Sequence, residues 1–275
     1  MSGEAFGCEV VVTRSGARAM RDRATGELMH PVVGPRVEAE RLYVKPSRLE
    51  ARLGESNAEP LVLLDVGLGA GSNAALAWQV SEALPRTARR LELVSFERDL
   101  SALELAQRPE HAAAFGLEGG AGAAVRRLLA EGRHESARGV WRLCLGELPG
   151  QFGQLTPGSA DIVFWDPFSP RANPELWTLA AFTALVPFCR QGATLHTYSA
   201  ATATRSALLL AGFSVGSGPV TGAGKRTTEA ALGVGHLARP LERSFLGRLT
   251  RSSAPFPPDA PADALERIAA LPQFA

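Results

Sequence analysis

The stretch LLDVGLGAGSN, residues 63–73, constrains the fold more than any other part of the sequence. An apolar run leads into three alternate glycines, Gly67, Gly69 and Gly71, and a helix-like segment follows them. Glycines at this spacing let the backbone turn sharply and approach a ligand closely. The stretch therefore predicts a buried strand, a tight turn and a helix over 72–84 capped by Ser72 or Asn73, which is how a doubly wound α/β domain begins.

Strand-like and helix-like segments alternate along most of the chain. Further strands are expected at 90–97, 141–147, 161–166 and 192–199, and helices at 100–108, 174–189 and 202–212. This alternation predicts a parallel, doubly wound sheet. The last two expected strands, 213–218 and 228–234, leave no room for a helix between them, so they should form a hairpin with one strand antiparallel to the sheet. That ending is typical of the Rossmann-like class I methyltransferase fold rather than of the dinucleotide-binding fold.

Both ends of the chain fall outside this alternation. Residues 1–54 are expected to form a small extension that packs on the core, with a strand at 8–13, a turn-rich stretch at 14–27 and a helix at 37–54 interrupted near Pro46. Residues 55–240 are the expected methyltransferase domain. Residues 241–275 are expected to form a proline-rich tail with one short helix at 262–271.

Composition argues against several classes of protein. Cys8, Cys144 and Cys189 make no CxxC pair and the histidines show no HExxH spacing, so neither a disulfide framework nor a metal site is predicted. Scattered thiols fit a reducing compartment, which favours the cytoplasm, and no apolar run reaches membrane-spanning length. The chain has 29 basic and 28 acidic residues, but residues 14–52 hold nine Lys and Arg against five acids. This local excess is either a phosphate-binding face or a solvated, arginine-rich surface.

Acidic residues around the glycine turn point to the cofactor. Asp65 precedes the first glycine by two residues, and the third glycine comes one residue early for a dinucleotide-binding turn. A carboxylate here suits the cationic amino-acid end of S-adenosylmethionine and would repel a pyrophosphate. Glu97 ends the next strand, where it either accepts both ribose hydroxyls or caps the following helix. Glu147 ends the third strand and is either a partner of the adenine amino group or an ordinary loop acid. The expected cofactor-binding set is Asp65, Gly67, Gly69, Gly71, Asn73, Glu97 and Glu147.

The fourth expected strand ends at Asp166, which Pro167 and Phe168 follow. Parallel strands present their carboxyl ends at one edge of a sheet, so Asp166 is expected beside the cofactor and Asp161, at the other end of the strand, far from it. A carboxylate can accept the N–H groups of an amine and aim its lone pair, and an aromatic face stabilises positive charge building on nitrogen. Asp166 and Phe168 are therefore the predicted catalytic residues. The alternative is an Asp that caps the turn and a Phe packed in the core.

Several motifs, in order along residues 25–235, resemble one known family. DIVFWDPFSPRANPELW is similar to the hallmark D-x-F-x-D-x-F-[SA]-P-x-x-N-P-x-[ML]-W of the MnmC-type tRNA methyltransferases, and LLDVGLGAGSNAALAW resembles their glycine turn, with Asp65 in place of Glu. TYSAATATRSALLLAGFSV followed by GAGKRTTEA, and GELMHPVVGPRVEAERLYVKPSRL, resemble further elements. The resemblance implies methyl transfer from S-adenosylmethionine to the aminomethyl group of a modified wobble uridine in tRNA, giving 5-methylaminomethyl-2-thiouridine.

Carried over by position, the resemblance implies roles for individual residues. Asp166 would hold the amine and Phe168 would pack on the uracil, with Pro167 also in the substrate site, where bifunctional members usually carry Gly. Lys225 and Arg226 would bind the substrate through tRNA phosphate or within the site itself, unless they are simply a charged hairpin tip.

Other residues in the motifs are given supporting parts. Asn173 and Trp177 are expected to brace the site loop rather than to touch substrate. His30, Glu38 and Glu40 lie in a segment that is a candidate cover for the cofactor.

The chain has no second glycine fingerprint and is short for the FAD-dependent domain of the bifunctional members. A stand-alone methyltransferase, fed by a separate enzyme that supplies the aminomethyl group, is therefore expected. Two alternatives stay open: a methyltransferase acting on another amine, and a non-catalytic module that binds the cofactor or RNA.

Overall fold

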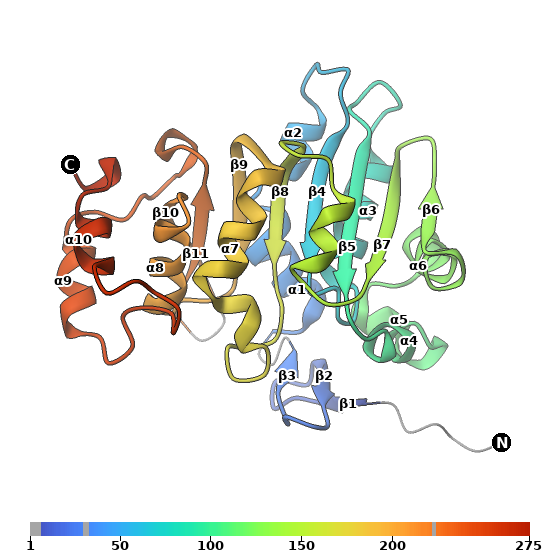
Figure 1. The fold of residues 1–275 in the computed structure, drawn as a ribbon. Helices are drawn as coiled ribbons and strands as arrows, with labels where there is room; N and C mark the ends of the chain where they lie inside the picture. Colours follow the sequence, from blue (N-terminus) through green and yellow to red (C-terminus); the bar gives the residue numbers. More distant parts are fainter. Residues whose placement is uncertain (1–6, 30–32, 222–223) are drawn as a thin grey trace.

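The computed structural model describes residues 7–29, 33–221 and 224–275. Within these ranges the chain forms an eight-stranded sheet and a separate three-stranded sheet (Figure 1). The large sheet has the order β10-β11-β9-β8-β4-β5-β7-β6. Its strands are β4 (Leu61–Val66), β5 (Leu91–Glu97), β6 (Arg133–Glu135), β7 (Gly139–Leu145), β8 (Ala160–Trp165), β9 (Cys189–Thr197), β10 (Ser214–Val220) and β11 (Arg226–Ala231).

The central strands are parallel and doubly wound. β4 pairs with β5 on one side and β8 on the other, and the parallel pairing continues to β7 and β9. The chain order therefore reverses between β4 and β8, and ligands bind at such a switch point in open α/β sheets. β11 runs antiparallel between β9 and β10, which confirms the expected hairpin. The short antiparallel strand β6 was not predicted.

Strand β4 is buried on both faces because its apolar side chains alternate between two cores. Leu61 and Leu63 belong to one hydrophobic cluster, whereas Val62, Leu64 and Val66 belong to the other. A continuous apolar strand of this kind is what a parallel sheet covered on both faces requires.

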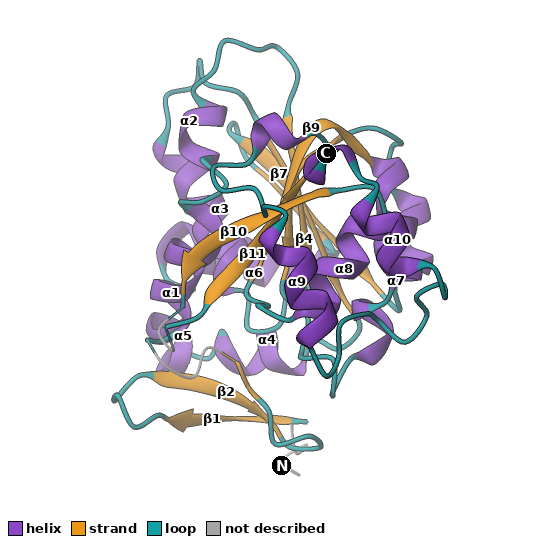
Figure 2. Cartoon of the chain, turned by 90° about the vertical axis from the view of Figure 1, so that its left-hand side faces the viewer, coloured by secondary structure: helices purple, strands orange, loops and turns teal. Residues whose placement is uncertain are grey.

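Helices supply the other half of each core, and Figure 2 shows α3 on one side of the sheet and α7, α8 and α10 on the other. The first layer contains α3 (Ser72–Ala83), α4 (Ser101–Ala106), α5 (Pro109–Phe115) and α6 (Gly119–Glu131). The second contains α7 (Leu179–Leu185), α8 (Thr202–Leu210), α9 (Ser244–Arg251) and α10 (Ala264–Ala269). The expected helix over 174–189 is divided, because a 3-10 turn over Pro174–Trp177 precedes α7. α9 was not predicted, although Phe245 and Leu249 bury one face of it.

The N-terminal segment forms the three-stranded antiparallel sheet, with β1 (Cys8–Val12), β2 (Arg18–Asp22) and β3 (Leu28–Met29). The prediction of a turn-rich stretch over 14–27 was wrong for β2, whose Ala19 and Met20 are fully buried between charged neighbours. The following helical segment is interrupted near Pro46, as predicted. α1 (Pro35–Glu38) and the π-helix η1 (Ala39–Val44) precede the interruption, and α2 (Leu49–Leu53) follows it. Figure 1 places the small sheet at the edge toward which the arrowheads of β4, β5 and β8 point.

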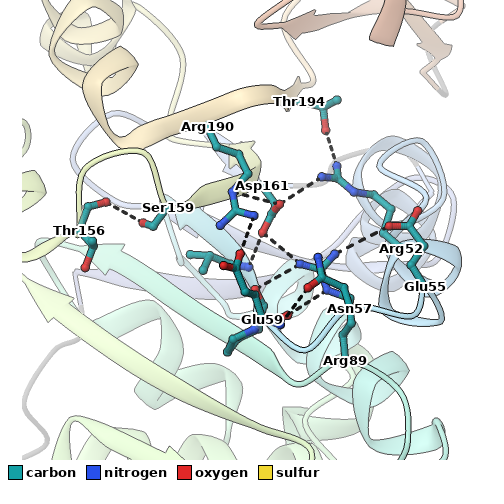
Figure 3. Close-up of polar contacts among 12 residues, drawn as sticks. Arg52, Glu55, Asn57, Glu59, Arg89, Thr156, Ser159, Asp161, Arg190 and Thr194 are labelled. Carbon is teal, nitrogen blue, oxygen red and sulfur yellow. Dashed lines mark hydrogen bonds and ion pairs between the residues drawn. The ribbon is translucent and has the colours of Figure 1, made fainter.

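The opposite edge of the large sheet holds a buried charge cluster (Figure 3). The Asp161 carboxylate, on a side chain that is 5% exposed, lies 3.7 Å from Arg52, 3.8 Å from Arg89 and 3.6 Å from Arg190. Its Oδ2 also accepts the N–H of Val62 at 2.9 Å. The cluster thus connects five parts of the chain: α2, the three strands β4, β8 and β9, and the loop that precedes β5. Asp161 lies at the start of β8, so it is far from the carboxyl edge, as predicted.

Candidate active site

A cavity of about 450 Å³ lies at the carboxyl edge of the sheet, at the switch point between β4 and β8. The glycine turn after β4 and the loop after β8 form two of its walls, and the N-terminal sheet contributes residues to another. Of the predicted site residues, the lining includes Gly67, Gly69, Asn73, Glu97, Glu147, Asp166, Pro167 and Phe168. The lining does not include Asp65, Gly71, Lys225 or Arg226.

The glycine turn brings the two strand ends into contact. Gly67 has a φ of +85°, and a Cβ there would lie 2.7 Å from the backbone oxygen of Asp166 and 2.7 Å from the nitrogen of Pro167. Only a residue without a side chain allows this approach. Gly71 has a φ of +83° and precedes α3, and a Cβ there would meet Leu103 at 2.7 Å. The turn therefore fixes the loop after β8 as well as the start of α3.

Glu97 faces the cavity and also stabilises the glycine turn. Its Oε2 accepts the N–H of Gly69 at 2.9 Å, and its Oε1 accepts the N–H of Arg98 at 2.8 Å. Burial raises the pKa of this carboxyl above its ordinary value. At the start of α4 it is Asp99 whose Oδ1 accepts the N–H of Ser101, at 2.7 Å, so Glu97 closes its own turn rather than that helix.

Asp65 lies within β4 and is 1% exposed. Its Oδ2 accepts the hydroxyl of Ser95 at 2.8 Å. Burial raises the pKa of Asp65 to about 7, and the negative charges of Asp166 and Glu97 act in the same direction. Because Asp65 is absent from the cavity wall, any effect on a bound cation would act through the turn or through its charge.

Asp166, one residue beyond β8, is held by two side-chain donors. Its Oδ1 accepts the hydroxyl of Tyr43 at 2.5 Å, and its Oδ2 accepts the Nδ2–H of Asn73 at 2.6 Å. These donors come from η1 and α3, which are remote from β8 in sequence. Both bonds lead away from the turn that follows β8, which argues against a carboxylate whose role is to cap it. Tyr43 was not among the site residues predicted from the sequence.

Two aromatic side chains hold the loop that carries Phe168 by hydrogen bonds to its backbone. The Trp177 Nε1–H donates to the backbone oxygen of Phe168 at 2.7 Å, and the Tyr198 hydroxyl donates to that of Pro167 at 3.1 Å. The rings of Trp177 and Tyr198 meet edge to face with centroids 5.7 Å apart. Asn173 lines the cavity and donates to Glu175. Phe168 is half-buried and lines the cavity, so it is not a core residue.

The N-terminal sheet is tied directly to this loop. The Glu27 carboxylate accepts the N–H of Ser169 at 2.8 Å and its hydroxyl at 2.7 Å, and Arg171 donates to the backbone oxygen of Thr25 at 3.0 Å. Met29 also approaches the glycine turn, because its sulfur lies 3.2 Å from where a Cβ of Gly69 would be. We call the Glu27–Ser169 and Thr25–Arg171 contacts the clasp.

The candidate cover segment contributes in part. Glu38 lines the cavity, whereas Glu40 pairs with Lys45 at 2.7 Å on the surface. His30 lies outside the described residues.

Lys225 and Arg226 are exposed at the turn between β10 and β11. Neither lines the cavity, but Thr221 does, and the Thr221 N–H donates to the backbone oxygen of Lys225 at 2.8 Å. The backbone of this turn therefore adjoins the cavity at Thr221. The basic excess in residues 14–52 is partly paired with acids: Arg21 and Arg23, for example, both contact Glu9.

The cavity wall is strongly acidic. Among the described lining residues one carries a guanidinium, Arg98, and eight carry carboxylates: Asp22, Glu27, Glu38, Glu97, Asp99, Glu147, Asp166 and Glu175. A low-dielectric cleft lined by one sign of charge concentrates ligands of the opposite sign. The site thus suits a cation and is unsuited to phosphate groups.

Residues 7–29, 33–221 and 224–275 offer neither a metal-binding cluster nor a membrane-spanning helix. No group of three or more His, Cys, Asp or Glu side chains there is placed to hold a metal ion. No helix in the same ranges combines the length and apolar character needed to cross a membrane.

The doubly wound sheet with its antiparallel hairpin, and the acidic cavity beside the glycine turn, define a class I S-adenosyl-L-methionine-dependent methyltransferase. Residues 130–233 match a family described as S-adenosyl-L-methionine-dependent methyltransferase. MnmC2 from Aquifex aeolicus superimposes with a TM-score of 0.73 at 27% identity, covering 97% of this chain and 84% of that one. Spermidine synthase from Thermotoga maritima, at 12% identity and a TM-score of 0.55 over 96% of this chain and 81% of that one, shares the fold.

Curated relatives give the same family. The tRNA 5-methylaminomethyl-2-thiouridine biosynthesis bifunctional protein MnmC of Methylibium petroleiphilum is 30% identical over 219 residues, which cover 78% of this chain and 33% of the relative. The protein of the same name from Aromatoleum aromaticum is 33% identical over 205 residues, covering 71% and 31%. The chain thus spans about a third of the length of these relatives. It belongs to the MnmC-type methyltransferases, whose cofactor is S-adenosyl-L-methionine.

Proposed function

We propose that this protein methylates the aminomethyl group of a modified wobble uridine in tRNA, forming 5-methylaminomethyl-2-thiouridine. The observation that carries the proposal is the contact between the glycine turn and the loop after β8. It brings the carboxylate of Asp166 and the ring of Phe168 into one acidic cavity with the turn. The similarity to MnmC proteins supports tRNA as the source of the amine.

The residues present fit the proposed cofactor. Gly67 and Gly69 allow close approach of a ligand to the turn, and the acidic wall favours a cation. Gly67, Gly69, Asn73, Glu97 and Glu147 would hold S-adenosylmethionine, with Gly71 shaping the helix start and Asp65 acting from within β4. When bound, this group supplies an electrophilic methyl on a sulfonium.

The protein's own part in the reaction is positioning and electrostatics. Asp166 accepts an N–H of the acceptor amine, which aims the nitrogen lone pair at the methyl group. As the N–C bond forms and the S–C bond breaks, positive charge moves to nitrogen, where the carboxylate and the Phe168 ring stabilise it. The extra proton on nitrogen is then released to water. Pro167 shapes the loop on which both side chains lie.

The tRNA backbone would stay outside the acidic cavity. The turn that carries Lys225 and Arg226 adjoins the cavity at Thr221, which supports the proposal that these two side chains would bind phosphate. A separate enzyme would supply the aminomethyl group. The three cysteines are free and buried, which fits a reducing compartment, and we propose the cytoplasm.

The decisive experiment is mass spectrometry of nucleosides from aminomethyl-bearing tRNA incubated with the protein and S-adenosylmethionine. We expect one added methyl group on the wobble nucleoside with wild type and loss of that product with Asp166→Ala. Calorimetry should show that this variant still binds the cofactor. If the wild type binds the cofactor but forms no tRNA product, the tRNA assignment is refuted and another amine is indicated. If the wild type does not bind the cofactor, the assignment of methyltransferase activity is refuted.

A further inference from the structure

The π-helix η1 delivers one side chain directly to the proposed amine site. Single π-helical turns are rare and occur frequently at functional sites. Tyr43 in η1 is 1% exposed, and its ring packs against Phe164 of β8 with centroids 5.4 Å apart. The ring therefore has a packing role, but packing alone would be served equally well by phenylalanine. The hydroxyl is the part that needs an explanation.

The direction of the hydroxyl is fixed by its surroundings. The backbone N–H of Tyr198 donates to the Tyr43 oxygen at 3.3 Å, and the Tyr43 hydroxyl donates to Asp166 Oδ1 at 2.5 Å. A phenol has one proton to donate, so that proton points at the carboxylate. Burial, followed by the charge of Asp166, raises the pKa of Tyr43 well above its ordinary value. The phenol therefore stays protonated and remains a donor.

Asn73 donates to the other carboxylate oxygen, so each oxygen of Asp166 accepts one side-chain hydrogen bond. The terminal torsion of an Asp side chain is intrinsically broad, so an unrestrained carboxylate would sample many orientations. Two donors on opposite oxygens define one orientation. Tyr43 and Asn73 are both uncharged, so they fix the carboxylate without cancelling the negative charge that faces the cavity.

We propose that Tyr43 is a positioning residue for methyl transfer, which holds the Asp166 carboxylate in the orientation that aims the acceptor amine. The inference rests on the proposed function, because it presupposes an amine at Asp166. Tyr43 acts through Asp166 and has no separate role in binding the cofactor. The N-terminal segment thus contributes a functional group to the chemistry as well as a wall to the cavity.

Tyr43→Phe tests the inference, because it keeps the ring against Phe164 and removes only the hydroxyl. Hydrogen bonds to charged groups are strong enough for their loss to lower kcat by about 10- to 100-fold. The KM and dissociation constant for S-adenosylmethionine should stay within about twofold of wild type, since a reorientation of Asp166 affects the reacting amine rather than cofactor binding. A kcat within about twofold of wild type would overturn the inference.

Ser206→Ala provides a matched control. Ser206 is also fully buried, and its hydroxyl donates to the backbone oxygen of Pro255 at 2.7 Å, away from the cavity. It should lose some thermal stability while keeping the wild-type kcat. If Y43F fails to fold, Tyr43→Met, a hydroxyl-free and adaptable apolar side chain, replaces it in the comparison. A loss of kcat that follows only the loss of stability across these variants would assign Tyr43 a structural role.

A double-mutant cycle tests whether Tyr43 acts through Asp166. Single-turnover transfer of radiolabelled methyl is measured for Y43F, Asp166→Asn and the double variant. We expect the double variant to be no slower than D166N alone, whereas multiplicative losses would contradict action through Asp166. A D166N rate below detection leaves the Y43F comparison decisive by itself. A wild type that transfers no methyl overturns both proposals, whereas an active wild type with an equally active Y43F overturns this one alone.

Discussion

Replacing Asp161 with asparagine isolates the contribution of the buried charge cluster at the amino edge of the sheet (Figure 3). The change keeps the size of the side chain and removes its charge. Three guanidinium groups, on Arg52, Arg89 and Arg190, then face a neutral amide. Arg89 is the most severely affected, because its side chain is 3% exposed and it cannot turn to water.

The expected loss of stability follows from the distances and the burial. At the observed 3.6–3.8 Å, each attraction is on the order of 4 kcal/mol at an effective dielectric constant of about 20. Desolvation of the carboxylate opposes these gains. Glu55 and Glu59 still reach Arg89 and Arg190, and they limit the damage. Removing one partner of a buried ion pair costs about 3–5 kcal/mol, which lowers Tm by on the order of 10 °C in a protein of this size.

Thermal and urea unfolding of D161N measure this loss, and Glu135→Gln is the matched control. Glu135 pairs with Arg133 at 2.8 Å and Arg90 at 3.1 Å, which are shorter distances, but its side chain is 50% exposed. We expect no measurable change in Tm for E135Q, because solvent screens exposed pairs. Equal effects of the two substitutions would refute the argument that burial outweighs distance. Cofactor affinity of D161N should be unchanged, since Asp161 lies at the opposite edge from the cavity.

Three further substitutions probe the carboxyl edge. Gly67→Ala places a Cβ 2.7 Å from the backbone of Asp166 at a φ of +85°, so calorimetry should show cofactor affinity reduced by more than about tenfold; ordinary affinity would contradict the close approach. Burial raises the pKa of Asp65 from 3.8 to about 7, so the folded protein holds a proton that the unfolded chain releases between these values. Wild type should therefore lose stability relative to Asp65→Asn as pH rises from about 4 to 7, and urea titrations giving a constant difference would disprove this. Glu27→Ala removes both bonds to Ser169, and amide exchange there should accelerate by on the order of tenfold, whereas unchanged exchange would show that the clasp does not restrain the loop.

Much of the fold was predictable because local pattern and tertiary structure agree. The apolar run of β4, the glycine turn and the hairpin without an intervening helix each carry their own signal. β2 was missed because charged residues flank its two buried side chains, so only its pairing with β1 and β3 defines it. α9 had a usable signal, since Phe245 and Leu249 are four residues apart on one face.

The candidate site was predictable where chemistry follows directly after a strand. Asp166, Phe168 and Glu97 fall into this group, because the carboxyl ends of parallel strands share one edge. Tyr43 reaches Asp166 across 123 positions, and no spacing rule encodes such a contact. Asp65 shows the opposite limit. Its position in the motif suggested a ligand contact, but alternation along β4 directs its side chain toward Ser95 of the next strand.

The carboxylate of Asp166 depends on segments that are synthesised long before it. Its two donors lie 123 and 93 positions upstream, and the clasp joins Glu27 to Ser169 across 142 positions. No fragment that ends before β8 can contain a working site, however well its own helices form. Methyl transfer therefore reports on complete chain assembly. In a partly denatured sample, residual methyl-transfer activity should be proportional to the fraction of native molecules. The helical content should be higher than that fraction, because partly folded chains also contribute to it.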